Sequence, residues 1–161
     1  MHLYADDAVL LVADPKAEEI QVELNREIIC AAKWTIANRL AIHTDKTKYM
    51  IFGRKQKLKS IDEMQAMIDN DKLKQSEIFK YLGVWFDPHL NLNENLKVLA
   101  DKISMKIGKI KRAMPFLSKT TRKLLVDAIV MPHFDYCSEA WSSASNTSVK
   151  RLERLYNKAR V

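Results

Sequence analysis

Two adjacent carboxylates near the amino end are the side chains in this sequence best suited to chemistry. Asp6 and Asp7 follow Tyr4 and Ala5 and precede an apolar run. Mg²⁺ is commonly held by one or two carboxylates together with water and substrate phosphates. Phosphoryl transfer with two metal ions uses such carboxylates to place the ions beside the attacking and leaving oxygens. The pair therefore indicates a metal site, with a solvated turn as the competing interpretation because aspartate is common in turns.

The segments around these acids predict a hairpin that presents them at its tip, followed by a helix. Residues 2–4 and 8–13 are short runs that favour strands. Asp14 and Pro15 are typical of a helix start, and the following pattern predicts an amphipathic helix to about Ala37, with Asn38 at its end. Its inward face, at spacings of three and four, consists of Ala17, Ile20, Leu24, Ile28 and Ala31.

The middle of the chain predicts further strands. Residues 40–44 and 47–52 are interpreted as two strands joined across residues 45–46, and residues 53–57 as a basic turn. Residues 60–77 fit either a helical period or a turn at 69–71 before a short strand. Residues 79–86 are the most strand-like segment, and Gly83 interrupts them.

Beyond about residue 88 the pattern becomes helical. Three amphipathic helices are predicted, the second capped by Ser118 and the third beginning after Ser148. The inward positions are Leu96, Leu99, Ile103, Ile107, Ile110 and Met114 in the first, Leu124, Leu125, Ala128 and Ile129 in the second, and Val149, Leu152, Leu155 and Ala159 in the third. Lysine and arginine are frequent at the remaining positions, so this half of the chain presents basic faces.

The distribution of charge points to a polyanionic partner. The chain has 27 Lys and Arg against 20 Asp and Glu; residues 1–45 hold four basic and eight acidic residues, and the remainder holds 23 and 12. A basic surplus favours binding to nucleic acid, a solubilising surface being the alternative. Two cysteines give no disulfide framework. Since no membrane-spanning run or secretory signal is recognised, we expect an intracellular protein, nuclear or cytoplasmic, without a membrane partner.

Four motifs, in order along the chain, resemble a known family. Residues 4–11 resemble the catalytic hairpin of reverse transcriptases. Residues 38–42 and 46–52 resemble the next palm motif of the non-long-terminal-repeat (LINE-like, jockey-like) branch, and residues 80–87 resemble its primer-grip hairpin. Asp135, Tyr136 and Trp141 are similar to a segment that follows the thumb helices. The chain thus resembles the C-terminal palm and thumb of a retrotransposon RNA-directed DNA polymerase.

The resemblance implies a fold, partners and a cofactor. The expected class is α+β, with an antiparallel palm remnant, its catalytic hairpin and a packed helix in residues 1–88. A helical, basic, thumb-like region is expected in residues 89–161. The implied partners are an RNA template and a DNA primer in a duplex, with deoxynucleotides in the intact enzyme. The implied cofactor is Mg²⁺, with Mn²⁺ as a possible substitute.

The resemblance also implies catalytic roles. Asp6 is expected to be the main metal ligand and Asp7 its weaker neighbour. Lys46 matches a lysine proposed to donate a proton to the departing pyrophosphate. A lysine in a solvated turn is the alternative, because a lysine needs a perturbed environment to act as an acid.

Contacts with nucleic acid are implied for eight residues. They are Tyr4, Ala5, Lys80, Tyr81, Gly83, Lys102, Lys106 and Lys109. Gly83 would allow a close approach of the primer backbone, and the lysines of the thumb-like helix would hold duplex phosphates without reading sequence. Trp85 and Phe86 are assigned to the core rather than to base stacking.

The departures from the family lead to a further expectation. His43 stands where asparagine is common, and Cys137 where glycine is frequent. The family takes another metal-binding aspartate and its fingers from residues before the hairpin. Because three residues precede Tyr4 here, we expect the 161-residue polypeptide not to polymerise alone.

Other functions stay open from the sequence. The main alternative is a non-catalytic basic module that binds nucleic acid, and a helical interaction protein is a third. His133 and Cys137 form at most half of a zinc site, which needs four ligands, so core or surface roles are expected for them. Residues 2–4 are expected to present an exposed strand edge through which the chain could associate.

Overall fold

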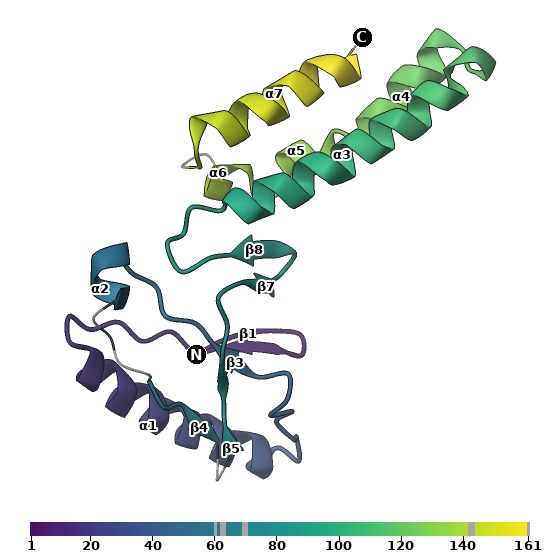
Figure 1. Ribbon diagram of the computed structural model, residues 1–161. Helices are drawn as coiled ribbons and strands as arrows, with labels where there is room; N and C mark the ends of the chain where they lie inside the picture. Colours follow the sequence, from purple (N-terminus) through teal and green to yellow (C-terminus); the bar gives the residue numbers. More distant parts are fainter. Residues whose placement is uncertain (60, 62–63, 69–70, 142–143, 161) are drawn as a thin grey trace. The chain divides into compact units, whose positions relative to one another are not determined.

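The computed structural model describes every residue except 60, 62–63, 69–70, 142–143 and 161. For residues 141 and 160 it describes the backbone and not the side chain. The chain divides into two compact units, Met1–Glu77 and Ile78–Val161 (Figure 1). Each unit has its own buried apolar cluster. Helices and short, mostly antiparallel strand pairs are mixed, as the predicted α+β class requires.

In its described residues, the first unit combines one long and one short helix with six short strands that form three pairs. Its elements are β1 (His2–Tyr4), β2 (Asp7–Val9), α1 (Ala17–Ala37), β3 (Lys48–Tyr49), α2 (Lys55–Lys59), β4 (Met67–Ile68), β5 (Asp71–Lys72) and β6 (Lys74–Gln75). The pairs β1–β2 and β4–β5 are antiparallel, and β3–β6 is parallel. The predicted antiparallel palm remnant is therefore wrong for β3–β6, and the described strands form separate two-stranded sheets.

The predicted amphipathic helix is confirmed as α1. It ends at Ala37 with Asn38 as its C-cap, and Ile28 of its inward face is buried. The predicted start, with Asp14 as N-cap and Pro15 in the first turn, is wrong: α1 begins at Ala17, and the Asp14 carboxylate instead accepts a hydrogen bond from the Lys16 backbone N–H at 2.8 Å in a turn before the helix. The Asn25 side chain connects α1 to strand β4, since its Oδ1 accepts a hydrogen bond from the Met67 backbone N–H at 3.0 Å.

The predicted hairpin across residues 45–46 is wrong. Residues 44–46 do form a turn, but the only strand of residues 40–52 is β3, which pairs in parallel with β6. Tyr49 explains this choice of partner. Its side chain is buried, and its hydroxyl donates to the Met64 carbonyl at 2.5 Å, so the β3 segment is held against Met64 as well as against β6.

The remaining segments of this unit also differ from prediction. β2 stops at Val9, and Leu10 instead packs against the buried cluster, so residues 10–13 are not a strand. The short helix α2 replaces the basic turn at 53–57. Between residues 60 and 77 the structure has the short strands β4, β5 and β6, and Met64 and Ile68 are buried. The predicted turn at 69–71 lies largely outside the described residues.

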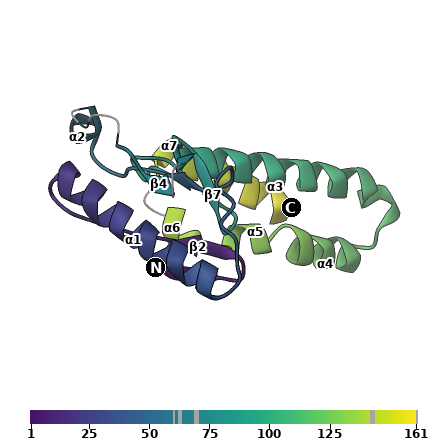
Figure 2. The same cartoon turned by 90° about the horizontal axis from the view of Figure 1, so that it is seen from below.

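The second unit is a hairpin followed by helices. Its elements are β7 (Phe79–Tyr81), β8 (Val84–Phe86), α3 (Asn93–Ala113), the 3₁₀ turn η1 (Met114–Phe116), α4 (Lys119–Ile129), α5 (Pro132–Asp135), α6 (Ser138–Trp141) and α7 (Asn146–Arg160). Helix α4 runs back along α3, and α7 packs beside α3 (Figures 1 and 2). The apolar stripe of α3 forms the centre of the buried cluster, which Val130, Phe134 and Leu152 complete.

The boundary between compact units lies at Glu77–Ile78 rather than near residue 88. The β7–β8 hairpin groups with the helices because its Trp85 backbone N–H donates to Oδ1 of the buried Asn95 of α3 at 3.1 Å. The strand-like segment 79–86, predicted to be interrupted at Gly83, forms the antiparallel pair β7–β8, so the hairpin that the resemblance implies for residues 80–87 is present. Its assignment to a palm, and that of the helices to a thumb, stay predictions.

The helix caps and faces of this unit are partly as predicted. Ser118 is the N-cap of α4 and its Oγ accepts from the Thr121 N–H at 3.1 Å. The inward assignment of Leu124, Ala128 and Ile129 is wrong, since all three residues are exposed, Leu124 at 65% and Ile129 at 40%. Helix α4 instead faces the cluster through Leu125 and Val126, continuing to Val130 just beyond its end. Val126 and Val130 are four residues apart and therefore share one face, which packs in the cluster and leaves Leu124 exposed.

The third helix begins earlier than predicted. Helix α7 starts at Asn146, and the Ser145 side chain accepts from the Ser148 N–H at 3.4 Å, so the cap is Ser145. Leu152 and Ala159 are buried as predicted. Within the described ranges, no helix has the length and apolar character needed to cross a membrane.

Candidate nucleic-acid interface

The predicted catalytic acids lie on the β1–β2 hairpin. Ala5 and Asp6 form a two-residue turn between Tyr4 and Asp7, which are opposite each other in the strand pair. Directly opposed residues point to the same face of a hairpin, so Tyr4 and Asp7 share one face. All four residues are exposed, and Ala5 has a left-handed φ of 51°. The tip therefore presents both carboxylates to the solvent, as predicted.

The two carboxylates have the donor chemistry of a magnesium or manganese site. Such ions bind oxygen ligands and often keep water or substrate phosphate in the remaining positions. In the parts of the chain that the structure describes, no group of three His, Cys, Asp or Glu side chains could hold a metal ion. Asp6 and Asp7 thus fit the ion only as part of a larger set, which nucleic-acid phosphate, water or further protein would complete.

Lys46 lies in the turn at residues 44–46. Its side chain is exposed, and its backbone N–H donates to the His43 carbonyl at 3.0 Å. Among the described interactions, no hydrogen bond or ion pair joins the Lys46 ammonium to Asp6 or Asp7. Its catalytic role stays a prediction.

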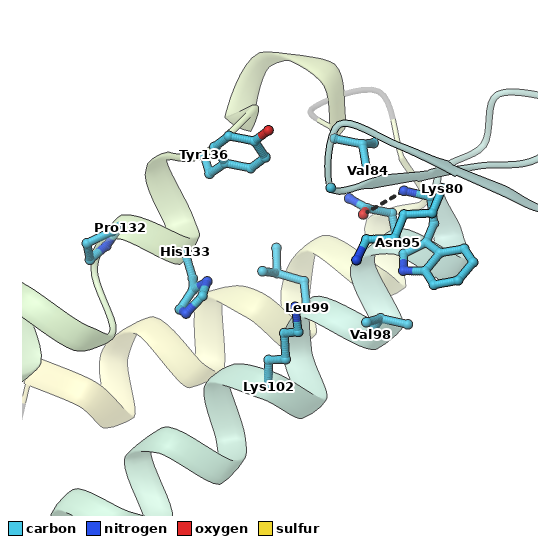
Figure 3. A pocket seen from close by; sticks show the side chains of 11 residues that line it. Lys80, Val84, Asn95, Val98, Leu99, Lys102, Pro132, His133 and Tyr136 are labelled. Atoms are coloured by element: carbon cyan, nitrogen blue, oxygen red, sulfur yellow. Dashed lines mark hydrogen bonds between the residues drawn. The ribbon is translucent and has the colours of Figure 1, made fainter. Parts of the chain in front are cut away.

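A hollow in the second unit brings three of the predicted nucleic-acid-binding residues together. Lys80, Gly83 and Lys102 line a space of about 350 Å³ (Figure 3). The hairpin β7–β8, helix α3 and the segment around α5 form its walls. The other lining residues are Val84, Trp85, Asn95, Val98, Leu99, Pro132, His133 and Tyr136. Within this unit, the hollow is where residues distant in the sequence and predicted to bind nucleic acid meet.

The turn of the hairpin is held against the residues that follow α5. The Tyr136 hydroxyl donates to the Leu82 carbonyl at 2.5 Å. Gly83 has a left-handed φ of 85°, and a Cβ placed there would lie 3.5 Å from the Tyr136 ring. A residue with a side chain would be strained at this φ. Glycine is therefore needed for the backbone conformation beside the hollow.

The hollow is electropositive. Lys80 places its ammonium 5.9 Å from the centroid of the Trp85 ring, a cation–π contact. Among the described ion pairs, none joins Lys80, Lys102 or Lys106 to a carboxylate. Lysines without a carboxylate partner leave their positive charge available to a bound anion.

His133 and Lys106 form a close pair at the edge of this hollow. The Lys106 ammonium donates to the Ile129 carbonyl at 3.3 Å and lies 2.5 Å from His133 Nε2. Because an ammonium has only donors, this contact favours the neutral imidazole with Nε2 as the acceptor. Burial, followed by the charges of Lys106 and Lys102, lowers the pKa of His133.

The other predicted contact residues lie outside the hollow. Tyr81 is half-buried at the end of β7, and Lys109 is exposed on α3. Trp85 and Phe86 are half-buried, and Trp85 lines the hollow. Asn95, His133 and Tyr136 also line the hollow, although the sequence did not predict them as contact residues. The sequence did point to Tyr136, because it belongs to the fourth motif that resembles the family. The sequence positions of Asn95 and His133 gave no indication of a role in binding.

Comparisons with known proteins give one distant relative. The chain is similar to a protein described as a probable RNA-directed DNA polymerase from the transposon X-element of Drosophila melanogaster, at 21% identity over 130 residues. The match covers 79% of this chain and 14% of the relative. No family model and no solved structure matches the chain. The sequence relation therefore supports a kinship with a transposon polymerase, of which this chain corresponds to a small part.

Proposed function

We propose that this chain is the palm-to-thumb part of a reverse transcriptase from a non-long-terminal-repeat retrotransposon. The observation that carries the proposal is the similarity to the Drosophila transposon polymerase over 130 residues. The four motifs that resemble this family, from residue 4 to residue 141, lie in the order that the family has. The proposed partners are an RNA template and a DNA primer, with deoxynucleotides as substrates of the intact enzyme.

The second unit supplies the proposed grip on the duplex. Residues 78–161 contain 15 Lys and Arg against seven Asp and Glu, and Lys80, Gly83 and Lys102 meet at one hollow. Contacts with phosphates position a duplex without reading its sequence. This arrangement supports binding of backbone phosphates by the hairpin and helix α3.

The first unit supplies the proposed catalytic acids. Asp6 and Asp7 would hold Mg²⁺ or Mn²⁺, which would stabilise the charge that develops as a phosphodiester forms. Their exposure at a hairpin tip leaves them accessible to a primer end. Lys46 would protonate the departing pyrophosphate. The described residues lack a third metal-binding side chain beside these two, so we expect no polymerisation by the 161-residue polypeptide alone.

A complementation experiment tests the catalytic proposal. The segment of the Drosophila polymerase that precedes the matched region is mixed with this chain, and extension of a primer on an RNA template is measured with Mg²⁺. Extension is expected only with both components, and Asp6→Asn should abolish it. Asp71→Asn, which removes an exposed carboxylate on β5, serves as the matched control and should retain extension.

The alternative is a non-catalytic module that binds nucleic acid through its basic helices. Like the main proposal, it has the lysines of the second unit bind the duplex, but it gives Asp6 and Asp7 no catalytic role. Duplex binding without extension in the complemented mixture would favour it. Extension by the 161-residue polypeptide alone would contradict the expectation that further residues are needed.

A further inference from the structure

The contact between Lys106 and His133 links the protonation of His133 to whatever binds in the hollow, which none of the predicted roles includes. In the free protein the neutral imidazole accepts a hydrogen bond from the Lys106 ammonium. Helix α3 also places Lys102 near this ring, and Lys80 and Tyr136 face it across the hollow. Helix α4 contributes the Ile129 carbonyl, which accepts from Lys106. The charged groups that surround His133 are thus cationic, and they favour its neutral form.

A bound anion would reverse this preference. A phosphate between His133 and Lys102 would offset the lysine charges, and an opposite charge within about 4–6 Å favours the charged form of histidine. The imidazolium would then donate an N–H to the phosphate instead of accepting from Lys106. We propose that this hollow is a phosphate site in which His133 takes up one proton from solvent when the phosphate binds.

The arrangement of lysines favours a nucleic-acid backbone as the source of that phosphate, a step that rests on the proposed function. Lys102, Lys106 and Lys109 are four and three residues apart on α3, so they lie along one face of the helix. The row extends over about 10 Å at 1.5 Å per residue. A polyanion can use the whole row, whereas a single inorganic phosphate can use only part of it.

The test measures how duplex affinity depends on pH. A labelled RNA–DNA duplex is titrated with the 161-residue chain at constant ionic strength at about pH 7.5 and about pH 5.5. The affinity of the unmodified chain is expected to rise about 3- to 10-fold at the lower pH, because one unit of pKa shift corresponds to a tenfold change. His133→Gln retains an acceptor for Lys106 but cannot take up a proton, and its affinity should change less than about 2-fold.

A matched control and a second readout keep the test decisive. His89→Gln removes a histidine that does not line the hollow and should retain the pH dependence. Nuclear magnetic resonance of the His133 ring follows its protonation directly in the unmodified chain, with and without duplex. The ring is expected to be neutral at pH 6.5 without duplex and protonated with it. An unchanged ring, or equal pH dependence in His133→Gln, would overturn the proposal.

Two further outcomes distinguish a nucleic-acid phosphate from free phosphate, and the proton uptake by His133 from the proposed function itself. Inorganic phosphate at the same charge concentration is expected to move the His133 resonance far less than duplex does. An equal effect at equal concentration would identify a free-phosphate site and refute the backbone assignment. If no duplex binds at either pH, the proposed function fails; if duplex binds but His133 stays neutral, only this inference fails.

Discussion

The side-chain carbonyl of Asn95 accepts a hydrogen bond from the backbone N–H of Trp85 at 3.1 Å. This bond joins the β7–β8 hairpin to helix α3, and Asn95 is the polar residue in the buried set of the described chain, at 8% exposure. The hollow that contains Lys80 and Lys102 depends on this junction, because the two lysines come from the two joined elements. Asn95 therefore positions the two elements of the proposed interface, a role that the sequence composition does not indicate.

Removal of this junction should destabilise the second unit. Asn95→Leu leaves the Trp85 N–H without its partner, and a buried donor left unsatisfied costs about 1–3 kcal/mol. Chemical denaturation should show this decrease in the free energy of unfolding. Asn157→Leu on an exposed position of α7 is the matched control and is expected to change stability by less than about 0.5 kcal/mol. Equal effects of both variants would contradict the role of Asn95.

Two glycines should respond in opposite directions to alanine. Gly83 has a φ of 85°, so Gly83→Ala should destabilise the unit by about 1–2 kcal/mol through backbone strain. Gly108 lies inside α3, where the nearest atom to an added Cβ is the Arg112 guanidinium at 4.0 Å. Gly108→Ala should stabilise by about 0.5–1 kcal/mol. Thermal unfolding compares the two; stabilisation by Gly83→Ala would refute the need for glycine in the hairpin turn.

The turn that carries the proposed catalytic acids should gain stability from glycine. Ala5 adopts a φ of 51°, which is unfavourable for a residue with a Cβ and natural for glycine. Ala5→Gly should therefore increase protection of the β1–β2 backbone amides in hydrogen exchange. Ala8→Gly in β2 is the control and should decrease protection, since glycine weakens a strand. Reduced protection in Ala5→Gly would show that the turn has another conformation.

His133 should make the stability of the free protein depend on pH. Its pKa is lowered in the folded state by burial and by the neighbouring lysines, whereas the unfolded chain has the ordinary value of about 6.5. The unfolded state then binds more protons between the two values, so stability is fully present above about pH 6.5 and falls as the pH decreases through the folded pKa. Urea titrations of His133→Gln should show a weaker loss than the unmodified chain between pH 7 and pH 5. An equal loss would exclude His133 as its source.

Local signals in the sequence were sufficient to predict the four longer helices α1, α3, α4 and α7, though not every boundary and face. The spacing of apolar residues predicts which face of α1 and of α3 is buried. Serine is a preferred N-cap residue, and the Ser118 side chain caps α4. The hairpin tip at Asp6 was also predictable, because strand-favouring residues flank it. These features depend on neighbours in sequence.

Features that depend on distant residues were not predictable. The parallel pairing of β3 with β6 follows from the burial of Tyr49 and its bond to the Met64 carbonyl, 15 residues away. The outward position of Leu124 follows from the packing of α4 on α3. The pairing of His133 with Lys106 spans 27 residues and becomes visible only when α5 and α3 are placed together. The predicted acids required a family resemblance as well as their residue types.

The most direct test of the account is the salt dependence of duplex binding by the second unit's lysines. The affinity of the full chain for an RNA–DNA duplex is measured from 50 to 300 mM salt, each lysine–phosphate contact contributing about one to the log–log slope. We predict that Lys80→Gln/Lys102→Gln lowers the slope by about two, while Lys16→Gln/Lys33→Gln, with the same change in net charge, leaves it unchanged. Equal slopes for the two double variants, or binding that does not vary with salt, would contradict the account.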